Sequence, residues 1–271
     1  MDVLREVRCI GLQLNLYDKK LQITDKNIRN YGDIYMRDDC PMKENPICID
    51  CELDCFRKPL EAEAIFYEQK IQELEKIGRE LMKDLPLWRD WIQKYVKGAG
   101  VGLTLRILGY LDFNKAKHPS SFWAFAGYTS EARKTQRYNH SLKGLCVRQA
   151  MSFLGIRSIT PAFIANPEPR LDGGYARFFK MIRAKADEKY PDWTRRHKLF
   201  HAMSVMMKLY LSHIFIVHNF LTNNIASVHY AAAHLGHDYI YMPVIDAKEK
   251  PDWWHDLAKE YVKMGIKPVE I

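Results

Sequence analysis

Apolar residues recur along much of this chain at the three- and four-residue steps of an α-helix. From Pro59 to about Asp84 they follow a heptad seam with charged flanks, which predicts one long amphipathic helix in which Gly78 is a flaw. Two interpretations stay open: a helix that lies on its own domain, or an arm that forms a homodimer through residues 59–86. The seam positions are Ala64, Tyr67, Ile71, Leu74, Gly78, Leu81 and Leu85.

The first segment has a different pattern. Ile10, Leu12, Leu14 and Leu16 alternate with small or polar residues, and a period of two predicts a strand. A turn at 17–20 and a return strand at 21–24 would complete a small hairpin.

The stretch from 97 to 128 organises the rest. An apolar helical face over 87–96 leads into closely spaced glycines, and a second apolar helix runs over 103–111. A helix, glycine turn and helix predict a helix-hairpin-helix-like turn, in which backbone amides bind a phosphate without reading bases. The alternative is an ordinary turn between core helices. The predicted nucleic-acid contacts here are Lys97, Gly98, Gly100, Gly102 and Thr104.

The most apolar stretch, 203–221, is interrupted by Lys208, His213 and His218, which favours a buried helix over a membrane span.

Taken together, these patterns predict a mainly α protein in four parts. These are an N-terminal region with a four-cysteine metal site (1–58), the helical arm (59–86), a helical DNA-binding domain (87–222) and a C-terminal tail packed on the body (223–271).

Charge adds a class of partner. The 271 residues carry a net charge of +8, and the pI near 9.0 favours a polyanion. Between Lys115 and Arg148 the one acid is Glu131, which favours phosphate contact over a merely solvated face, while a second basic face follows on a later helix. DNA is the expected partner and structured RNA the alternative. The candidate residues are Arg133, Lys134, Arg137, Lys143 and Arg148, then Arg177, Lys180 and Arg183.

Four of the six cysteines fall in one short stretch with the spacing C-x7-C-x2-C-x3-C. Four thiolates can hold zinc or a four-iron iron–sulfur cluster, and the spacing does not choose between them. Incidental free thiols are the alternative. The ligands would be Cys40, Cys48, Cys51 and Cys55.

Two further features bear on location and metal binding. The N-terminus carries charged residues before any apolar run, so we expect a cytoplasmic protein without membrane association. His197 and His201 are four residues apart and could hold a metal, but no acid completes an H-E-x-x-H pattern, so structural histidines are favoured.

Several short motifs occur in a recognisable order: GVGLT at 100–104, LG at 108–109, LDF at 111–113, FWAFAGY at 122–128 and SLKGLCVR at 141–148. Together with the preceding arm they resemble the C-terminal domain of the transposases of the insertion sequence 110/116/902 group, relatives of Piv-type DNA invertases. The resemblance covers about residues 60–220. It implies a helical DNA-binding scaffold.

The chain also departs from that family. Its members begin with a ribonuclease-H-like domain that supplies acids for a divalent metal, and about 58 residues are too few for that fold. The family's nucleophilic serine has no clean match, although Ser130 or Thr135 stands near its place, and Mg²⁺ is implied only if catalysis remains. Ala99 and Leu145 replace the family's proline and asparagine.

The resemblance therefore implies a truncated or repurposed DNA-binding protein more strongly than a recombinase. The alternatives are a strand-transfer enzyme that takes its acids from a partner, and a metal-stapled dimeric interaction protein without a nucleic-acid role.

Overall fold

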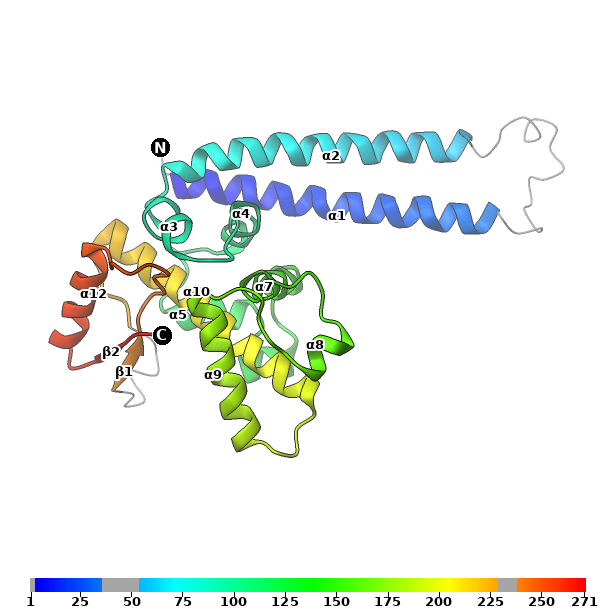
Figure 1. Ribbon diagram of the computed structural model, residues 1–271. Helices are drawn as coiled ribbons and strands as arrows, with labels where there is room; N and C mark the ends of the chain where they lie inside the picture. Colours follow the sequence, from blue (N-terminus) through cyan, green and yellow to red (C-terminus); the bar gives the residue numbers. More distant parts are fainter. Residues whose placement is uncertain (1–2, 36–53, 229–237) are drawn as a thin grey trace, which may run out of the picture.

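The computed structural model describes the fold of residues 3–35, 54–228 and 238–271, and the side chains of these ranges except at 30–35, 54–58 and 133. The described chain is mainly helical, as predicted. A long helical hairpin projects from a compact helical body, and a small C-terminal unit lies on the opposite side of the body (Figure 1).

The hairpin consists of α1 (Val3–Tyr35) and α2 (Asp54–Lys83), which run antiparallel along each other (Figure 1). The predicted β-hairpin in this region is wrong, because α1 is helical throughout. Its buried positions Val7, Gly11 and Leu14 follow steps of four and three, whereas Leu12 and Leu16 are 45% and 52% exposed. The apparent alternation combined one buried helical stripe with one solvent-facing stripe.

The heptad helix is present, and it begins at Asp54, five residues before Pro59. Its seam residues Ala64, Tyr67 and Leu74 are buried on the side that packs against α1 of the same chain. The helix therefore lies on its own domain, the first of the two interpretations. A homodimer through 59–86 stays a prediction, and it would use outward-facing side chains such as Ile65 and Phe66.

Glycines allow the hairpin to pack closely on α4 (Val101–Tyr110). A Cβ atom added to Gly109 would lie 2.5 Å from the carbonyl carbon of Gly11, so the two helices meet backbone to backbone. A Cβ atom on Gly78 would lie 2.2 Å from Cδ2 of Leu105. The glycine that interrupts the heptad seam is thus the socket that receives a leucine from α4.

A buried arginine joins the same three helices. Arg106 on α4 donates to Asp18 on α1 at 2.6 Å and to Glu75 on α2 at 2.9 Å. Burial by itself lowers the pKa of this guanidinium, but the two carboxylates outweigh that effect and raise it. Asn15 Nδ2 also donates to the Arg106 carbonyl oxygen at 3.0 Å. The joint therefore combines close backbone packing with a paired internal charge.

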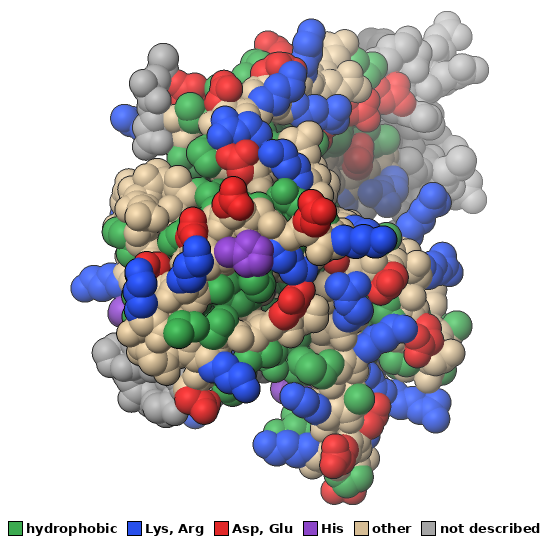
Figure 2. Space-filling model, turned by 60° about the vertical axis from the view of Figure 1, so that its left-hand side comes forward, with side chains coloured by type: hydrophobic (Ala, Val, Ile, Leu, Met, Phe, Trp, Pro, Cys, Tyr) green, Lys and Arg blue, Asp and Glu red, His purple; other side chains and the backbone are tan. Residues whose placement is uncertain are grey.

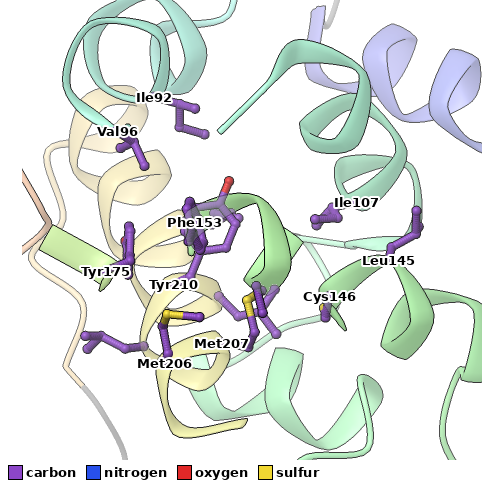
Figure 3. Close-up of a cluster of buried hydrophobic side chains, with 14 of the residues drawn as sticks. Ile92, Val96, Ile107, Leu145, Cys146, Phe153, Tyr175, Met206, Met207 and Tyr210 are labelled. Atoms are coloured by element: carbon purple, nitrogen blue, oxygen red, sulfur yellow. The ribbon is translucent and has the colours of Figure 1, made fainter. Parts of the chain in front are cut away.

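The body is organised around α10 (Arg195–Asn223), in which every residue from Lys198 to Phe220 is buried or half-buried. Tyr210 packs against Phe153 and Tyr175 with ring centroids 4.9 and 5.3 Å apart, and Met206 and Met207 extend this core (Figure 3). Within the described residues α10 is the one helix long and apolar enough to cross a membrane, yet 72% of its apolar window is buried inside the protein. The surrounding elements are η1 (Leu87–Ile92, a π-helical turn), α3 (Gln93–Tyr95), α5 (Pro119–Phe125), α6 (Ser130–Thr135), α7 (His140–Phe153), α8 (Pro161–Ala165) and α9 (Gly174–Lys189).

The C-terminal unit contains β1 (Tyr239–Tyr241), α12 (Asp252–Lys263) and β2 (Lys267–Val269), and the two strands pair in parallel. Phe220 of α10 packs with Leu257 and Tyr261 of α12 in a second small core. The tail is therefore attached to the end of α10.

Candidate nucleic-acid interface

The glycine turn between α3 and α4 is packed against α7 rather than left open. Gly98 has a φ of +85°, and its carbonyl oxygen accepts hydrogen bonds from Gln149 Nε2 at 2.9 Å and Ser152 Oγ at 2.7 Å. A Cβ atom on Gly98 would lie 2.8 Å from the Ser152 carbonyl oxygen. This glycine serves helix packing, which was the alternative interpretation of the turn.

The other predicted turn contacts separate into different environments. Gly100 is exposed and caps α4, with nothing near its added Cβ position. Gly102 lies beside the Arg106 guanidinium, 3.5 Å from its added Cβ position. Thr104 is fully buried and its N–H donates to the Gly100 carbonyl oxygen at 3.1 Å, so this residue gives no support to the predicted contact, which stays a prediction. The helical period of α4 turns this hydroxyl toward the core.

Lys97 connects the turn to the start of α9 through a buried acid that sequence reasoning missed. Its backbone N–H donates to Asp246 at 3.0 Å, and its Nζ donates to the Asp172 carbonyl oxygen at 3.1 Å. The Asp246 side chain is only 2% exposed and also accepts from the Gly174 N–H at 2.7 Å. A single aspartate in an apolar run gives no sequence signal for this role, because its donors lie over 70 residues away.

The three predicted contact residues on α9 are paired with acids. Arg177 lies 3.4 Å from Asp172 and 3.5 Å from Asp246. In separate pairs, Lys180 contacts Glu168 at 2.9 Å, and Arg183 contacts Asp187 one turn further along. These cations are already neutralised in part, which weakens the predicted α9 contact face.

The segment formed by α6 and α7 is different. We call Lys134, Arg137, Lys143 and Arg148 the basic α6–α7 surface. Lys134, Arg137 and Arg148 are exposed, and within the described residues none of the three forms an ion pair with an acid. Arg133 also lies in α6, but its side chain is outside the described part. On the face in Figure 2, by contrast, basic and acidic side chains are interspersed, so net charge alone does not identify a contact surface.

Local packing holds the loop between α6 and α7 in place. Gly127 has a φ of +74°, and its added Cβ atom would lie 2.5 Å from the Tyr138 ring. The Lys143 ammonium lies 4.6 Å from the centre of that ring, and the His140 ring lies 4.2 Å from it. Asn139 caps α7 by accepting from the Leu142 N–H at 2.8 Å. The side chains of the basic α6–α7 surface therefore extend from a backbone that local packing fixes in place.

The outer face of α7 leaves room for a ligand. His140, Gly144 and Arg148 follow steps of four residues and are all exposed, so they share one face. No atom lies within 4 Å of the position that a Cβ of Gly144 would occupy. A phosphodiester backbone could approach α7 closely at this glycine.

The two candidate nucleophiles lie at opposite ends of α6. Ser130 is its exposed first residue, and Thr135 Oγ1 donates to the Glu131 carbonyl oxygen at 3.0 Å. In the part of the chain that the structure describes, no group of three His, Cys, Asp or Glu side chains could hold a metal ion. The described residues thus supply no assembled Mg²⁺ site for strand transfer.

The predicted cysteine site falls mostly outside the described residues. Cys40, Cys48 and Cys51 lie there, while Cys55 lies in the first turn of α2 with its side chain not described. Zinc or iron–sulfur binding therefore stays a prediction.

A separate hollow of about 850 Å³ lies at the base of the hairpin and is lined in part by Arg8, Asp112, Lys115 and His218. Arg8 and Asp112 pair across it at 3.2 Å, and Lys115 lies 3.9 Å from the same acid. Burial works against ionisation of Asp112, but Arg8 and the backbone N–H groups of Lys115 and Asn114 together outweigh it and lower the pKa of the carboxyl group. Because its cations are shared with an acid, this hollow is a weaker phosphate site than the α6–α7 surface.

Comparison of the chain with protein-family models, curated proteins and solved structures found no match. The function is therefore argued from the geometry of the chain itself.

Proposed function

We propose that this protein binds DNA through the basic α6–α7 surface, holding phosphates without reading sequence. The observation that carries the proposal is the contrast between two groups of cations. Lys134, Arg137 and Arg148 are exposed without an acid partner in the described chain, whereas Arg177 and Lys180 on α9 are each paired with an acid. Cations that neutralise phosphates release the counterions condensed on DNA, which supplies most non-specific affinity, and an unpaired cation does not first have to give up an acid partner.

The shape of α7 supports the same proposal. Gly144 leaves its outer face open between His140 and Arg148, so a polyanion can contact the helix backbone as well as the flanking side chains. Tyr138 and His140 add aromatic surface beside the cations. Cations interleaved with aromatic rings suit a nucleic acid better than a simple anion.

The resemblance to insertion sequence 110/116/902 transposases also favours DNA. Two of its motif segments, GVGLT and SLKGLCVR, form the start of α4 and most of α7, and these helices pack against each other. In this proposal the first segment builds the scaffold and the second presents the contact face. The proposed activity is binding; strand transfer would need metal-binding acids from a partner.

The test is a salt series of binding to a short fluorescent DNA duplex, read by anisotropy. If each side chain neutralises one phosphate, Lys134→Ala/Arg137→Ala should lower the slope of log affinity against log salt by about 1.8 and weaken binding about 30-fold near 0.15 M salt. The matched control is Lys259→Ala/Lys263→Ala, which removes two exposed cations from α12. That control should change binding by less than about threefold.

Equal losses in the two double variants would show that net charge alone governs binding, and this would refute the α6–α7 surface. Unchanged binding by Lys134→Ala/Arg137→Ala would refute it as well. A structured RNA run in parallel identifies the nucleic acid: tighter binding to RNA than to DNA would overturn the choice of DNA.

A further inference from the structure

Three aromatic rings stack at the corner between α9 and α10. The rings of Tyr190 and Trp193 are 4.0 Å apart and inclined by 6°, and those of Trp193 and His197 are 4.1 Å apart and inclined by 2°. We call these three residues the corner stack. The corner lies at the lower end of the body in Figure 1, where α9 ends and α10 begins.

The corner stack is held in place by the backbone of the turn. The Trp193 N–H donates to the Tyr190 carbonyl oxygen at 3.2 Å, and the His197 N–H donates to the Thr194 hydroxyl at 3.2 Å as α10 begins. His201 meets the Trp193 ring edge-on at 5.4 Å. The rings are thus preorganised, which reduces the entropy lost when a ligand binds them.

The corner stack lies outside the hydrophobic core. The His197 side chain is exposed and the Tyr190 and Trp193 side chains are half-buried, and none of the three packs against either apolar core of the described residues. Large aromatic rings normally contribute to stability by joining a core. The three parallel rings therefore form a stack outside the core, with Trp193 in the middle and exposed His197 at one end.

The charges around the corner stack favour an anionic ligand. Lys189 lies 5.5 Å from the centre of the Tyr190 ring, and Arg195 and Arg196 are exposed at the start of α10. The exposed acids of the same corner are Asp187, which already pairs with Arg183 and Lys198, and Glu188 and Asp192. Flat rings beside a majority of cations match the two chemical parts of a nucleotide, a planar base and a phosphate.

We propose that the corner stack binds an unpaired nucleobase of DNA, which adds to the stack on the exposed ring of His197 while Arg195 or Arg196 holds the adjoining phosphate. This deepens the proposed DNA-binding function, because it assigns unpaired DNA to a second contact apart from the basic α6–α7 surface. Bases in a duplex are already stacked on their neighbours, so the corner favours single strands, ends and extruded bases.

The test compares three fluorescent ligands: a short single-stranded oligothymidine, an abasic strand of equal length and a duplex. His197→Ala should weaken binding of oligothymidine about tenfold, the loss typical of one base–aromatic stack, and change binding of the other two ligands less than twofold. His197→Phe keeps a flat ring and should retain wild-type affinity. His255→Ala, which removes an exposed histidine from α12, is the matched control.

Two outcomes would overturn the corner stack: wild-type protein that binds oligothymidine no better than the abasic strand, or His197→Ala that binds all three ligands as the wild type does. Failure of the α6–α7 surface has a different signature. In that case the Lys134→Ala/Arg137→Ala variant would keep its duplex affinity while the loss of oligothymidine binding in His197→Ala persists.

Discussion

The close contact between α1 and α4 makes a sharp prediction about two glycines. In Gly109→Ala the new methyl group would start 2.5 Å from a backbone carbon of Gly11 and 2.7 Å from the Leu12 nitrogen. Ordinary contact begins near 3.4 Å, so the two helices must separate by about 1 Å at their crossing. Backbone atoms cannot rotate away as the end of a flexible side chain can. Separation would also loosen the fit of Leu105 against Gly78.

The magnitude follows from two opposing terms. Replacing a helical glycine by alanine contributes up to about 1 kcal/mol of helix stability, and overpacking costs about 1–3 kcal/mol. Because the overlap is between backbone atoms, we expect Gly109→Ala to lower the free energy of unfolding by about 2 kcal/mol, the upper end of this balance, which for a chain of 271 residues lowers Tm by about 3–4 °C. Gly144→Ala changes the same atoms at an open position on α7, so it should raise stability by up to about 1 kcal/mol.

Thermal and urea unfolding followed by circular dichroism would measure both variants beside the wild type. Hydrogen exchange adds a local readout. Amides of α1 near Gly11 should exchange faster than in the wild type in Gly109→Ala and at the wild-type rate in Gly144→Ala. A Gly109→Ala protein as stable as the wild type would refute the close crossing. A loss of the same size in both variants would instead assign the effect to helix chemistry.

Two further predictions concern buried groups. Arg106→Met removes the guanidinium that joins Asp18 and Glu75. Because both carboxylates keep partial contact with water, the free energy of unfolding should fall by about 2 kcal/mol, measured as a lower urea midpoint. An unchanged midpoint would contradict the stabilising role of these ion pairs. Burial raises the pKa of Cys146 to about 12, so native protein treated with iodoacetamide near about pH 8 should be modified at exposed Cys9 and not at Cys146; peptide mass mapping that finds equal labelling would contradict the burial.

The helices whose apolar residues repeat at regular steps along the sequence could be predicted well. The heptad of α2 is a local pattern that any apolar partner satisfies, so the helix was recognisable without knowing that α1 covers it. The same pattern made Gly78 look like a defect. Its purpose depends on Leu105, 27 residues further along and on another helix, and no local rule contains that information.

Alpha1 shows how two periodicities can be confused. Leu12 and Leu16 are apolar yet exposed, and with buried Leu14 between them they imitate a strand. Apolar residues on the solvent face are common, because folded proteins keep much apolar surface. The helical interpretation required weighting Val7, Gly11 and Leu14, a set that includes a glycine and so carries a weak hydrophobic signal.

The candidate site was predictable in composition and less so in pairing. The run of basic residues around α6 and α7 is visible in the sequence, and so is the basic face of α9. What separates them is the position of acids such as Asp246, which is 69 residues from Arg177 and meets it only after folding. Counting charges along a chain gives the number of basic residues in a segment, whereas their pairing with acids depends on the tertiary structure.

The hairpin also has a mechanical consequence. Beyond Asp18, whose carboxylate holds the arm to Arg106, α1 continues for 17 residues, a length of about 26 Å, and Figure 1 shows this part projecting away from the body. A rotation of about 5° at the joint would therefore move the outer end by about 2 Å. The hairpin is thus a lever that turns about the contact between Asp18 and Arg106, so a small repacking beside α4 becomes a displacement the size of an atom at the outer end of α1.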